Sequence, residues 1–290
     1  MKKGIAISRL LSEGIASLKE HRCAPGDARR DAELLLTKAT DLGREAFLIH
    51  PETPVGAARV RAFRNLVRRR LNHEPMAYLL GTAWFRGREF LVNRDTLIPR
   101  WATESLVLAA ITALEKKLSA SIVDVGTGSG AIAVTLAVEL PQARILATDT
   151  SAKALAVARL NARRQGVSKR IVFQKIDLVP VRGSATAIIA NLPYLPTASL
   201  PKLSPDIRLH EPRIALDGDR GGLGPYRRLA EKISRWPHPP SHLFLEILPG
   251  QYRALASLIK KYLPSATCEK ITNPSSVCIG LKAQISDGTR

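Results

Sequence analysis

The spacing of apolar residues divides the chain into a helical leader and a region in which strands and helices alternate. In the leader, apolar residues recur at helical spacing over residues 7–19, 28–42 and 54–72. The breaks between these segments fall at Pro25-Gly26, Gly43 and Pro51, and Pro75 closes the set. The pattern predicts a small N-terminal helical domain over residues 1–80.

The rest of the chain follows a different pattern. Two short apolar segments, residues 84–85 and 88–92, flank Arg86-Gly87 and predict a β-hairpin in a linker over residues 81–102. Over residues 103–285 short apolar runs alternate with helical periods, which predicts βαβ units and a mainly parallel sheet with helices on both faces. Residues 266–271 and 277–282 predict a closing hairpin, and residues 286–290, without a core-forming side chain, predict a flexible tail.

A glycine-rich loop follows the first strand of this α/β region. The strand contains Asp124, the loop reads Gly126-Thr127-Gly128-Ser129-Gly130, and an apolar helix follows over residues 131–138. Alternate glycines allow a tight turn and a close approach of a ligand to the backbone, and the start of the helix offers free N–H groups. The spacing differs from the GxGxxG of dinucleotide folds, and the loop alone is equally consistent with a structural turn.

The next two strands end in acidic residues. Asp149 closes the strand over residues 143–149, where an acceptor-only side chain can hold a ribose diol. Asp149 could instead cap the following helix, but Ser151 can fill that role, which favours diol binding as the role of Asp149. The strand over residues 170–176 ends in Asp177-Leu178, where an acid and an apolar side chain can bracket an adenine; an ordinary turn is equally consistent.

The motif Asn191-Leu192-Pro193-Tyr194 follows the buried run over residues 187–190. The Asn191 side-chain oxygen and the Leu192 carbonyl can accept hydrogen bonds, and Tyr194 offers a face for a flat group. The motif predicts a site for a planar NH2 group, either an amide or a nucleobase. Residues 195–219 show no periodicity, and a long irregular segment after a site is often a lid that contacts substrate.

Together these motifs resemble those of S-adenosylmethionine-dependent methyltransferases. Further segments are similar to those of the release-factor glutamine methyltransferases: Leu97-Ile98-Pro99-Arg100-Trp101-Ala102-Thr103-Glu104, Glu211-Pro212-Arg213-Ile214-Ala215-Leu216, Gly221-Gly222-Leu223 and Tyr226-Arg227. The resemblance implies an α/β fold with a seven-stranded Rossmann-like methyltransferase sheet whose last strand is antiparallel. It also implies S-adenosylmethionine as cofactor and the glutamine of the Gly-Gly-Gln motif of a peptide chain release factor as substrate.

Site residues follow from the motifs and the resemblance together. The expected cofactor contacts are Asp124, Gly126, Thr127, Gly128, Ser129, Gly130, Asp149, Asp177, Leu178 and Asn191. The expected catalytic and substrate-binding residues are Asn191, Leu192, Pro193 and Tyr194.

The chain departs from the family at four places. Leu192 replaces the first proline of Asn-Pro-Pro-Tyr, Trp101-Ala102 replaces Pro-Glu, Asn273-Pro274-Ser275-Ser276 stands where the family tends to carry Asp, Gly and Arg, and residues 248–251 form an enlarged turn. Two alternatives therefore stay open. One is an adenine N6-methyltransferase acting on rRNA or DNA, since related enzymes carry Asn-Leu-Pro-Tyr; the other is a non-catalytic binding protein on the same fold.

The net charge of the chain indicates the kind of partner it binds. The 290 residues carry a formal net charge of +19, with a pI near 10.4, which favours acidic partners and proximity to the ribosome or RNA. Arginines concentrate in one predicted helix, at positions Arg59, Arg61, Arg64, Arg68, Arg69 and Arg70. A solvated helix face explains this cluster better than a dedicated nucleic-acid patch.

Composition also limits location and metal chemistry. No apolar run is long enough to span a bilayer, so no membrane partner is expected. Cys23, Cys268 and Cys278 are few and odd in number and lack metal-ligand spacing, which favours a cytoplasmic protein. The six histidines form no HxH or HxxxH pair, so no metal site is expected.

Overall fold

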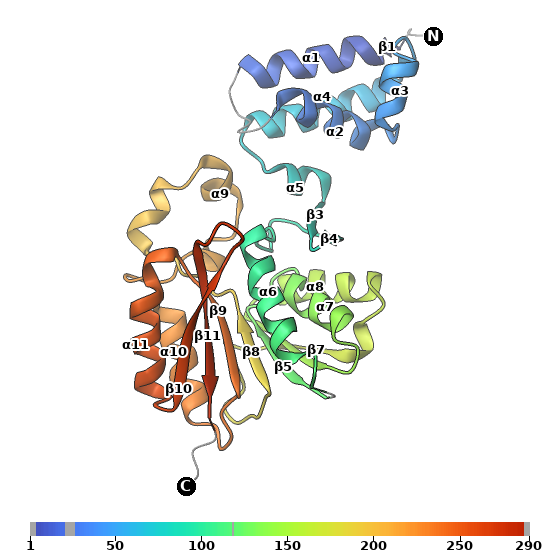
Figure 1. Ribbon diagram of the computed structural model, residues 1–290. Coiled ribbons are helices and arrows are strands. Elements are labelled where there is room, and N and C mark those ends of the chain that lie inside the picture. Colours follow the sequence, from blue (N-terminus) through green and yellow to red (C-terminus); the bar gives the residue numbers. More distant parts are fainter. Residues whose placement is uncertain (1–3, 21–26, 118, 287–290) are drawn as a thin grey trace. The chain divides into compact units, whose positions relative to one another are not determined.

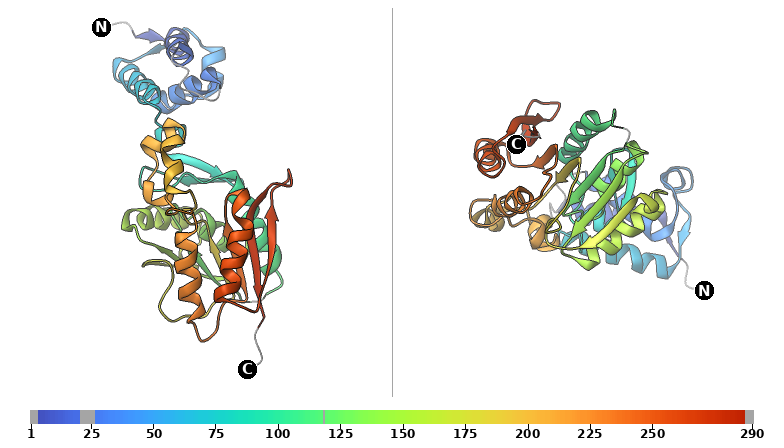
Figure 2. Two further views of the ribbon diagram at one scale, coloured as in Figure 1. Left: turned by 90° about the vertical axis from the view of Figure 1, so that its left-hand side faces the viewer. Right: turned by 90° about the horizontal axis from the view of Figure 1, so that it is seen from below.

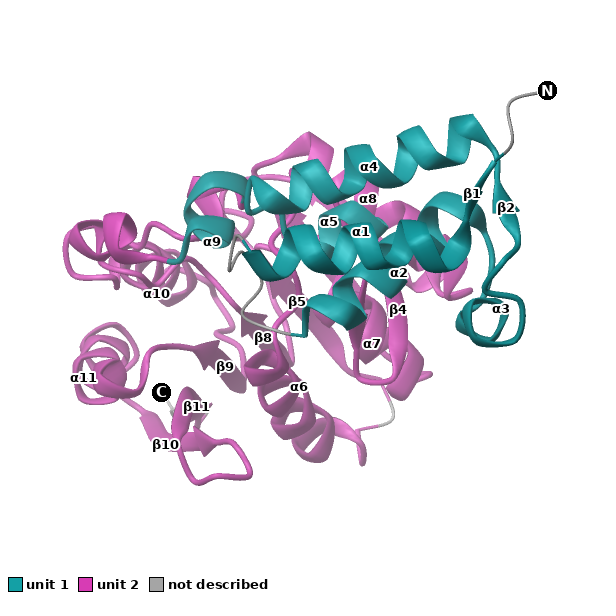
Figure 3. Ribbon diagram, turned by 90° about the horizontal axis from the view of Figure 1, so that it is seen from above, with its two compact units in different colours: residues 1–82, 204–210 teal, residues 83–203, 211–290 magenta. Residues whose placement is uncertain are grey.

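The computed structural model describes residues 4–20, 27–117 and 119–286 and contains two compact units (Figure 3). Unit 1 comprises Met1–Thr82 with Ser204–His210, and unit 2 comprises Ala83–Leu203 with Glu211–Arg290. Each unit has its own hydrophobic core. The predicted break at Pro25-Gly26, the residue Cys23 and the tail beyond residue 286 lie outside the described residues.

Unit 1 is helical. Its elements are β1 Ile5–Ala6, α1 Ile7–Glu20, α2 Ala28–Thr40, α3 Arg44–Ile49, β2 Pro54–Val55, α4 Ala57–Leu71, α5 Met76–Leu80 and α9 Pro205–His210. The predicted third helix begins at Ala57 and not at residue 54, because β2 pairs antiparallel with β1. Helix α2 ends at Thr40 because Asp41 adopts a left-handed φ of 58°.

The arginines of α4 divide between the interior and the surface. Arg70 is buried and donates to Asp31 Oδ2 at 3.1 Å, while Arg69 forms an ion pair with Glu74 at 2.7 Å. The outward-facing arginines are Arg59, Arg61, Arg64 and Arg68, and Arg64 is paired with Glu13 at 2.8 Å. The exposed basic face is therefore narrower than the sequence cluster.

Unit 2 is built on one seven-stranded sheet, which confirms the predicted fold class. The strands are β5 Ser121–Val125, β6 Arg144–Asp149, β7 Ile171–Lys175, β8 Ala187–Ala190, β9 His242–Glu246, β10 Ala266–Thr272 and β11 Cys278–Ile285. Their order is β10-β11-β9-β8-β5-β6-β7, and β11 runs antiparallel to both neighbours. A separate hairpin, β3 Thr82–Phe85 with β4 Arg88–Leu91, precedes the sheet.

Helices cover both faces of this sheet (Figures 1 and 2). One face carries α6 Trp101–Leu114, α7 Ala131–Glu139 and α8 Ala152–Arg164; the other carries α10 Gly224–Ser234 and α11 Tyr252–Tyr262. Short 3-10 turns link these elements: η1 Ser168–Arg170, η2 Thr197–Lys202, η3 Arg213–Ala215 and η4 Pro249–Gln251. No helix among the described residues has the length and apolarity to cross a membrane.

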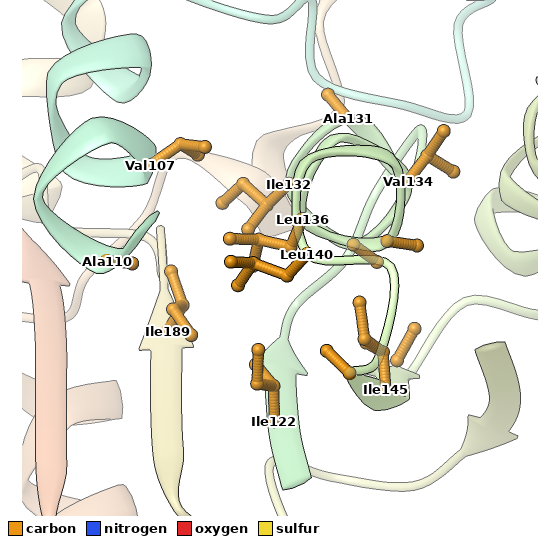
Figure 4. Packing of buried hydrophobic residues seen from close by; sticks show 14 of the residues in the cluster. Val107, Ala110, Ile122, Ala131, Ile132, Val134, Leu136, Leu140, Ile145 and Ile189 are labelled. Carbon is orange, nitrogen blue, oxygen red and sulfur yellow. The ribbon is translucent and has the colours of Figure 1, made fainter. Parts of the chain in front are cut away.

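Central strands and helix α7 form a dense apolar layer. Ile122, Ile145 and Ile189 point from β5, β6 and β8 toward α7, where Ile132 and Leu136 meet them (Figure 4). All five side chains are at most 6% exposed. Close packing of α7 against these strands fixes where β5 ends and where α7 begins. It thereby fixes the position of the glycine loop between them.

A buried asparagine links that loop to the β3–β4 hairpin. Asn161 of α8 donates from Nδ2 to the Leu91 carbonyl at 2.9 Å and to the Ser129 carbonyl at 2.8 Å. Its Oδ1 accepts from the Leu91 N–H at 2.8 Å. Since the residue is only 1% exposed, its removal leaves three backbone groups without these bonds.

The Asn161→Ala substitution is expected to lower the free energy of unfolding by about 1–3 kcal/mol, because buried backbone groups of Leu91 and Ser129 lose their partners. Urea unfolding measures the change. The matched control is Leu160→Ala at the neighbouring, 44% exposed position, expected to cost less than about 1 kcal/mol. Equal losses in the two variants contradict the assigned role of Asn161.

Candidate functional site

A cavity of about 570 Å³ opens at the carboxyl ends of β5, β6 and β8. From β5 the chain proceeds to β6 on one side, and β8 lies on the other side. Ligands of open α/β sheets bind at such a switch point, and the volume is in the range of small-molecule sites. The lining residues predicted from the sequence are Gly126, Thr127, Gly128, Ser129, Asp149, Asp177, Leu178, Asn191, Leu192 and Pro193.

The glycine loop is held to the end of β6. The N–H groups of Gly126 and Thr127 both donate to the Thr148 carbonyl at 2.9 Å. Gly128 has φ +55°, and a Cβ on it would have no neighbour closer than 4.0 Å, so this glycine leaves open space in the cavity wall. Gly130 instead packs against Ala158 of α8 and lies outside the cavity lining.

Asp124 lies beneath the loop and not in the cavity lining. Its Oδ2 accepts from the Thr127 hydroxyl at 2.6 Å and from the Ala133 N–H at 3.1 Å. The carboxyl group is fully buried, and this burial raises its pKa to about 7, against the hydrogen bonds that lower it. The side chain therefore connects the loop to the first turn of α7.

Asp149 accepts two backbone hydrogen bonds at the end of β6, and the helix-cap role considered for it is filled by Ser151. Its Oδ1 accepts from the Ser151 N–H at 2.8 Å, and its Oδ2 accepts from the Gly128 N–H at 2.9 Å. Ser151 itself caps α8 through the Ala154 N–H at 3.1 Å. Each carboxylate oxygen has a second lone pair, and Asp149 lines the cavity, so acceptor capacity remains for a ligand.

The turn after β7 is strained at the cavity wall. Leu178 has a φ of 63°, which is uncommon for a residue with a large side chain. The Thr148 hydroxyl donates to the Leu178 carbonyl at 2.6 Å and holds this conformation. Asp177 is half-exposed and forms an ion pair with Lys232 at 3.2 Å. The turn thus presents Leu178 to the cavity, while Asp177 is directed in part to Lys232.

The departure at Leu192 has a structural explanation. Leucine has the N–H group that proline lacks, and this N–H donates to the Tyr226 hydroxyl at 3.3 Å. The same hydroxyl donates to the Glu246 backbone carbonyl. The Leu192 side chain is 4% exposed and packs over Gly126. Hydrogen bonding and packing therefore fix the backbone that proline would otherwise restrain.

Two side chains of the motif are held by buried polar side chains. Asn191 donates from Nδ2 to the Thr103 hydroxyl at 3.0 Å, and the Tyr194 hydroxyl donates to Glu246 Oε1 at 3.1 Å. Burial and the Glu246 charge raise the pKa of Tyr194 well above its usual value. Tyr194 lies outside the cavity lining, and Gln251 holds its carbonyl at 2.9 Å. The structure thus places this ring behind the motif.

The segment over residues 195–219 contains short helical turns and is less irregular than predicted. Its η3 turn contributes Arg213, Ile214 and Ala215 to the cavity lining. Glu211, which precedes η3, forms an ion pair with Arg100, and its Oε2 accepts from the Ile98 N–H at 3.4 Å. This ion pair links the cavity-lining turn to the start of α6.

Several buried residues of the site were given no site role in the sequence interpretation, although Thr103 and Tyr226 belong to segments that carry the family resemblance. These residues are Thr103, Thr148, Asn161, Tyr226 and Glu246, all at most 4% exposed. A polar residue inside an apolar run, such as Glu246 after His242-Leu243-Phe244-Leu245, was the available signal. Their partners lie 20–88 positions away, so no local pattern reveals them.

Comparisons with known proteins agree with this geometry. Residues 9–81 match the family described as PrmC N-terminal domain, and residues 104–199 match the methyltransferase small domain. The catalytic domain of hMettl16 in complex with MAT2A 3'UTR hairpin 1 has a similar structure, with a TM-score of 0.54. At 14% identity, covering 97% of this chain and 92% of that one, the likeness shows a shared fold.

Relatives found by sequence identify the family, whereas the structural likeness shows only the fold. The release factor glutamine methyltransferase of Moorella thermoacetica is 40% identical over 259 residues, covering 89% of this chain and 88% of that protein. The enzyme of the same name from Geobacter sulfurreducens is 36% identical over 237 residues, covering 81% and 82%. The resemblance inferred from the motifs is confirmed, and the chain belongs to the release factor glutamine methyltransferase family.

Proposed function

We propose that the protein transfers a methyl group from S-adenosylmethionine to the side-chain amide nitrogen of the Gly-Gly-Gln glutamine in a peptide chain release factor. The observation that carries the proposal is the Asn191-Leu192 pair at the cavity, next to the glycine loop. With Nδ2 committed to Thr103, Asn191 keeps Oδ1 as an acceptor, and Leu192 adds a backbone carbonyl. Two acceptors suit a planar NH2 donor.

The cavity fits the cofactor. Gly128 leaves its wall open, α7 begins beside it, and Asp149 keeps free acceptor capacity for a diol. Leu178 supplies an apolar surface for a purine ring. We assign Gly126, Gly128, Asp149 and Leu178 to cofactor binding. When bound, S-adenosylmethionine supplies a methyl carbon bonded to a positively charged sulfur.

The protein's own task is to position the amide. Its nitrogen is a poor nucleophile because the lone pair is delocalised into the carbonyl. Hydrogen bonds from its N–H groups to Asn191 Oδ1 and the Leu192 carbonyl orient the lone pair toward the cofactor-binding part of the cavity and strengthen as positive charge develops on nitrogen. Positioning two reactants contributes about 7–11 kcal/mol in well-oriented cases. The extra proton then leaves from nitrogen, so no titratable base is assigned.

We further propose that the basic surface of α4 helps the protein approach its substrate and that the protein acts in the cytoplasm. Arg59, Arg61 and Arg68 are exposed on α4, and a basic face favours approach to a release factor near ribosomal RNA. A cytoplasmic location is consistent with that substrate.

A labelling experiment tests the function. Purified protein is incubated with methyl-labelled S-adenosylmethionine and, separately, a release factor, its variant with alanine in place of the Gly-Gly-Gln glutamine, or rRNA. Label is expected on the intact release factor and not on the variant. Label on rRNA alone favours the adenine reaction, and absence of label together with no cofactor binding favours a binding protein.

Cofactor binding is tested at the glycine loop. The Gly128→Ala substitution places a methyl group at the cavity wall and is expected to weaken S-adenosylmethionine binding at least about tenfold, or 1.4 kcal/mol, in calorimetry. Gly166→Ala is the control, because Gly166 also has a positive φ, +72°, and open surroundings but lies outside the cavity lining. Equal effects of the two substitutions contradict the assignment.

Substrate positioning is tested at Asn191. The Asn191→Ala variant is expected to lose at least about 100-fold in kcat because it removes an acceptor used in the transition state, while cofactor affinity changes little. Steady-state kinetics and calorimetry give the two values. Gln174→Ala, which removes an exposed amide on β7, serves as control. Near-normal kcat in Asn191→Ala rules out the proposed positioning.

A further inference from the structure

The segment between Asp149 and Asp177 concentrates positive charge at one edge of the sheet. It contains seven lysines and arginines and no aspartate or glutamate. It folds into α8, η1 and β7, where β7 is the last strand of the sheet and α8 packs beside it. Six of the seven cations are exposed: Lys153, Arg159, Arg163, Arg164, Lys169 and Lys175. This edge of unit 2 is therefore a strongly basic surface.

Most of these charges are not neutralised within the protein. Lys153 and Arg164 are paired with carboxylates at 3.7 Å and 3.1 Å. The other four exposed cations form no ion pair in the part of the chain that the structure describes. Arg159 and Arg163 lie four positions apart on one face of α8, and like charges at this spacing repel each other. A bound polyanion would remove that repulsion, so the surface favours a negatively charged partner.

The two arginines line a hollow of about 330 Å³. Its other lining residues are Ser168, Ile171 and Phe173. Guanidinium and hydroxyl groups can donate to phosphate and ribose oxygens, while the aromatic and aliphatic side chains supply an apolar surface for a base. None of these residues lines the cavity at the glycine loop. The hollow is therefore separate from the methyltransferase site.

Arg159 is held in a fixed position over β7. Its guanidinium carbon lies 5.5 Å from the centre of the Phe173 ring, and its Nη2 donates to the Phe173 carbonyl at 3.0 Å. A guanidinium group has five N–H donors, so four remain for a ligand. RNA bases stack on aromatic rings and on arginine planes. A guanidinium restrained in this way needs less ordering when a nucleotide binds.

The same contact disfavours an added protein strand as the partner. A strand that extended the sheet would pair with the free edge of β7. The Ile176 N–H donates to the Asp149 carbonyl of β6. Backbone groups of alternate residues point to opposite sides of a strand, so the Phe173 carbonyl faces the free edge. Arg159 occupies that carbonyl, and the strand is only five residues long.

We propose that the surface formed by α8, η1 and β7 binds single-stranded RNA, with phosphates at Arg159, Arg163 and Lys169 and a base in the hollow beside Arg159. An RNA strand combines a row of negative charges with flat apolar groups, and the surface offers contacts for both. Binding there leaves the methyltransferase cavity accessible, because the two sites share no lining residue. The proposal does not depend on the proposed function.

Fluorescence anisotropy with a labelled oligouridylate of about 12 nucleotides tests the proposal. The Arg159→Gln/Arg163→Gln variant is expected to bind at least about tenfold more weakly than the wild type at about 0.1 M salt. The slope of log affinity against log salt is expected to fall by about 1.4, because each phosphate contact to a single strand contributes about 0.7. Unchanged thermal melting shows that the variant is folded.

The matched control is Arg182→Gln/Arg253→Gln, which removes the same charge at two other exposed arginines of unit 2. It is expected to weaken binding less than about threefold and to leave the salt slope unchanged. Equal losses in the two double variants overturn the proposal, because binding then follows net charge and not this surface.

Two further measurements address the kind of partner and the place of contact. A polyglutamate peptide of the same charge as the RNA represents an acidic protein, and displacement of the RNA by this peptide at equal concentration overturns the choice of RNA. With 4-thiouridine in the RNA, crosslinks are expected within residues 159–175. Crosslinks confined to residues 57–71, the arginine-rich helix α4, overturn the assigned surface.

Methylation separates this inference from the proposed function. Arg159→Gln/Arg163→Gln is expected to methylate an isolated release factor with the kcat of the wild type, since neither residue lines the cavity. A loss of methylation equal to the loss of RNA binding overturns the separation of the two sites. Wild-type protein that binds RNA through this surface but methylates no release factor contradicts only the proposed function.

Discussion

The site depends on two buried carboxyl groups, one beneath the glycine loop and one beside the Asn-Leu-Pro-Tyr motif. Asp124, under the glycine loop, and Glu246, behind the Asn-Leu-Pro-Tyr motif, are each at most 1% exposed, and burial raises the pKa of each to about 7. A buried carboxylate is tolerated when donors surround it. One oxygen of each carboxylate accepts from the glycine loop, the start of α7 or the motif, whereas Asp124 Oδ1 and Glu246 Oε2 have no partner among the described residues. The cost of burial is therefore offset in part, by bonds that also fix the geometry of the cavity.

The layered fold was predictable from the sequence because its signals are local. Apolar runs of strand length, such as residues 121–125 and 187–190, and the glycine spacing after β5 determine elements independently of their partners. The short strand β2 at Pro54–Val55 was missed, since two residues carry no period and pair with Ile5–Ala6 far away in the chain. Helix α9 was missed for the same reason of length.

The site was predictable only where its residues form a motif. Asn191, Gly128 and Asp149 stand at strand ends and line the cavity, whereas Thr103 and Glu246 act through partners 88 and 52 positions away. Tyr194 shows the limit most directly. A ring beside an amide motif suggested a stacking face, but the phenol turns toward Glu246, because a buried hydroxyl needs an acceptor.

In the proposed mechanism Asn191 and Leu192 supply the two acceptors for the substrate amide, although Leu192 replaces a proline of the family motif. Loss of a proline at Leu192 is accommodated by the Tyr226 hydroxyl, and the backbone carbonyl is retained. The most direct measurement is a crystal structure with S-adenosylhomocysteine and a Gly-Gly-Gln peptide. The account predicts the glutamine amide nitrogen within hydrogen-bond distance of both Asn191 Oδ1 and the Leu192 carbonyl. A glutamine bound elsewhere, or with its amide oxygen toward Asn191, would contradict it.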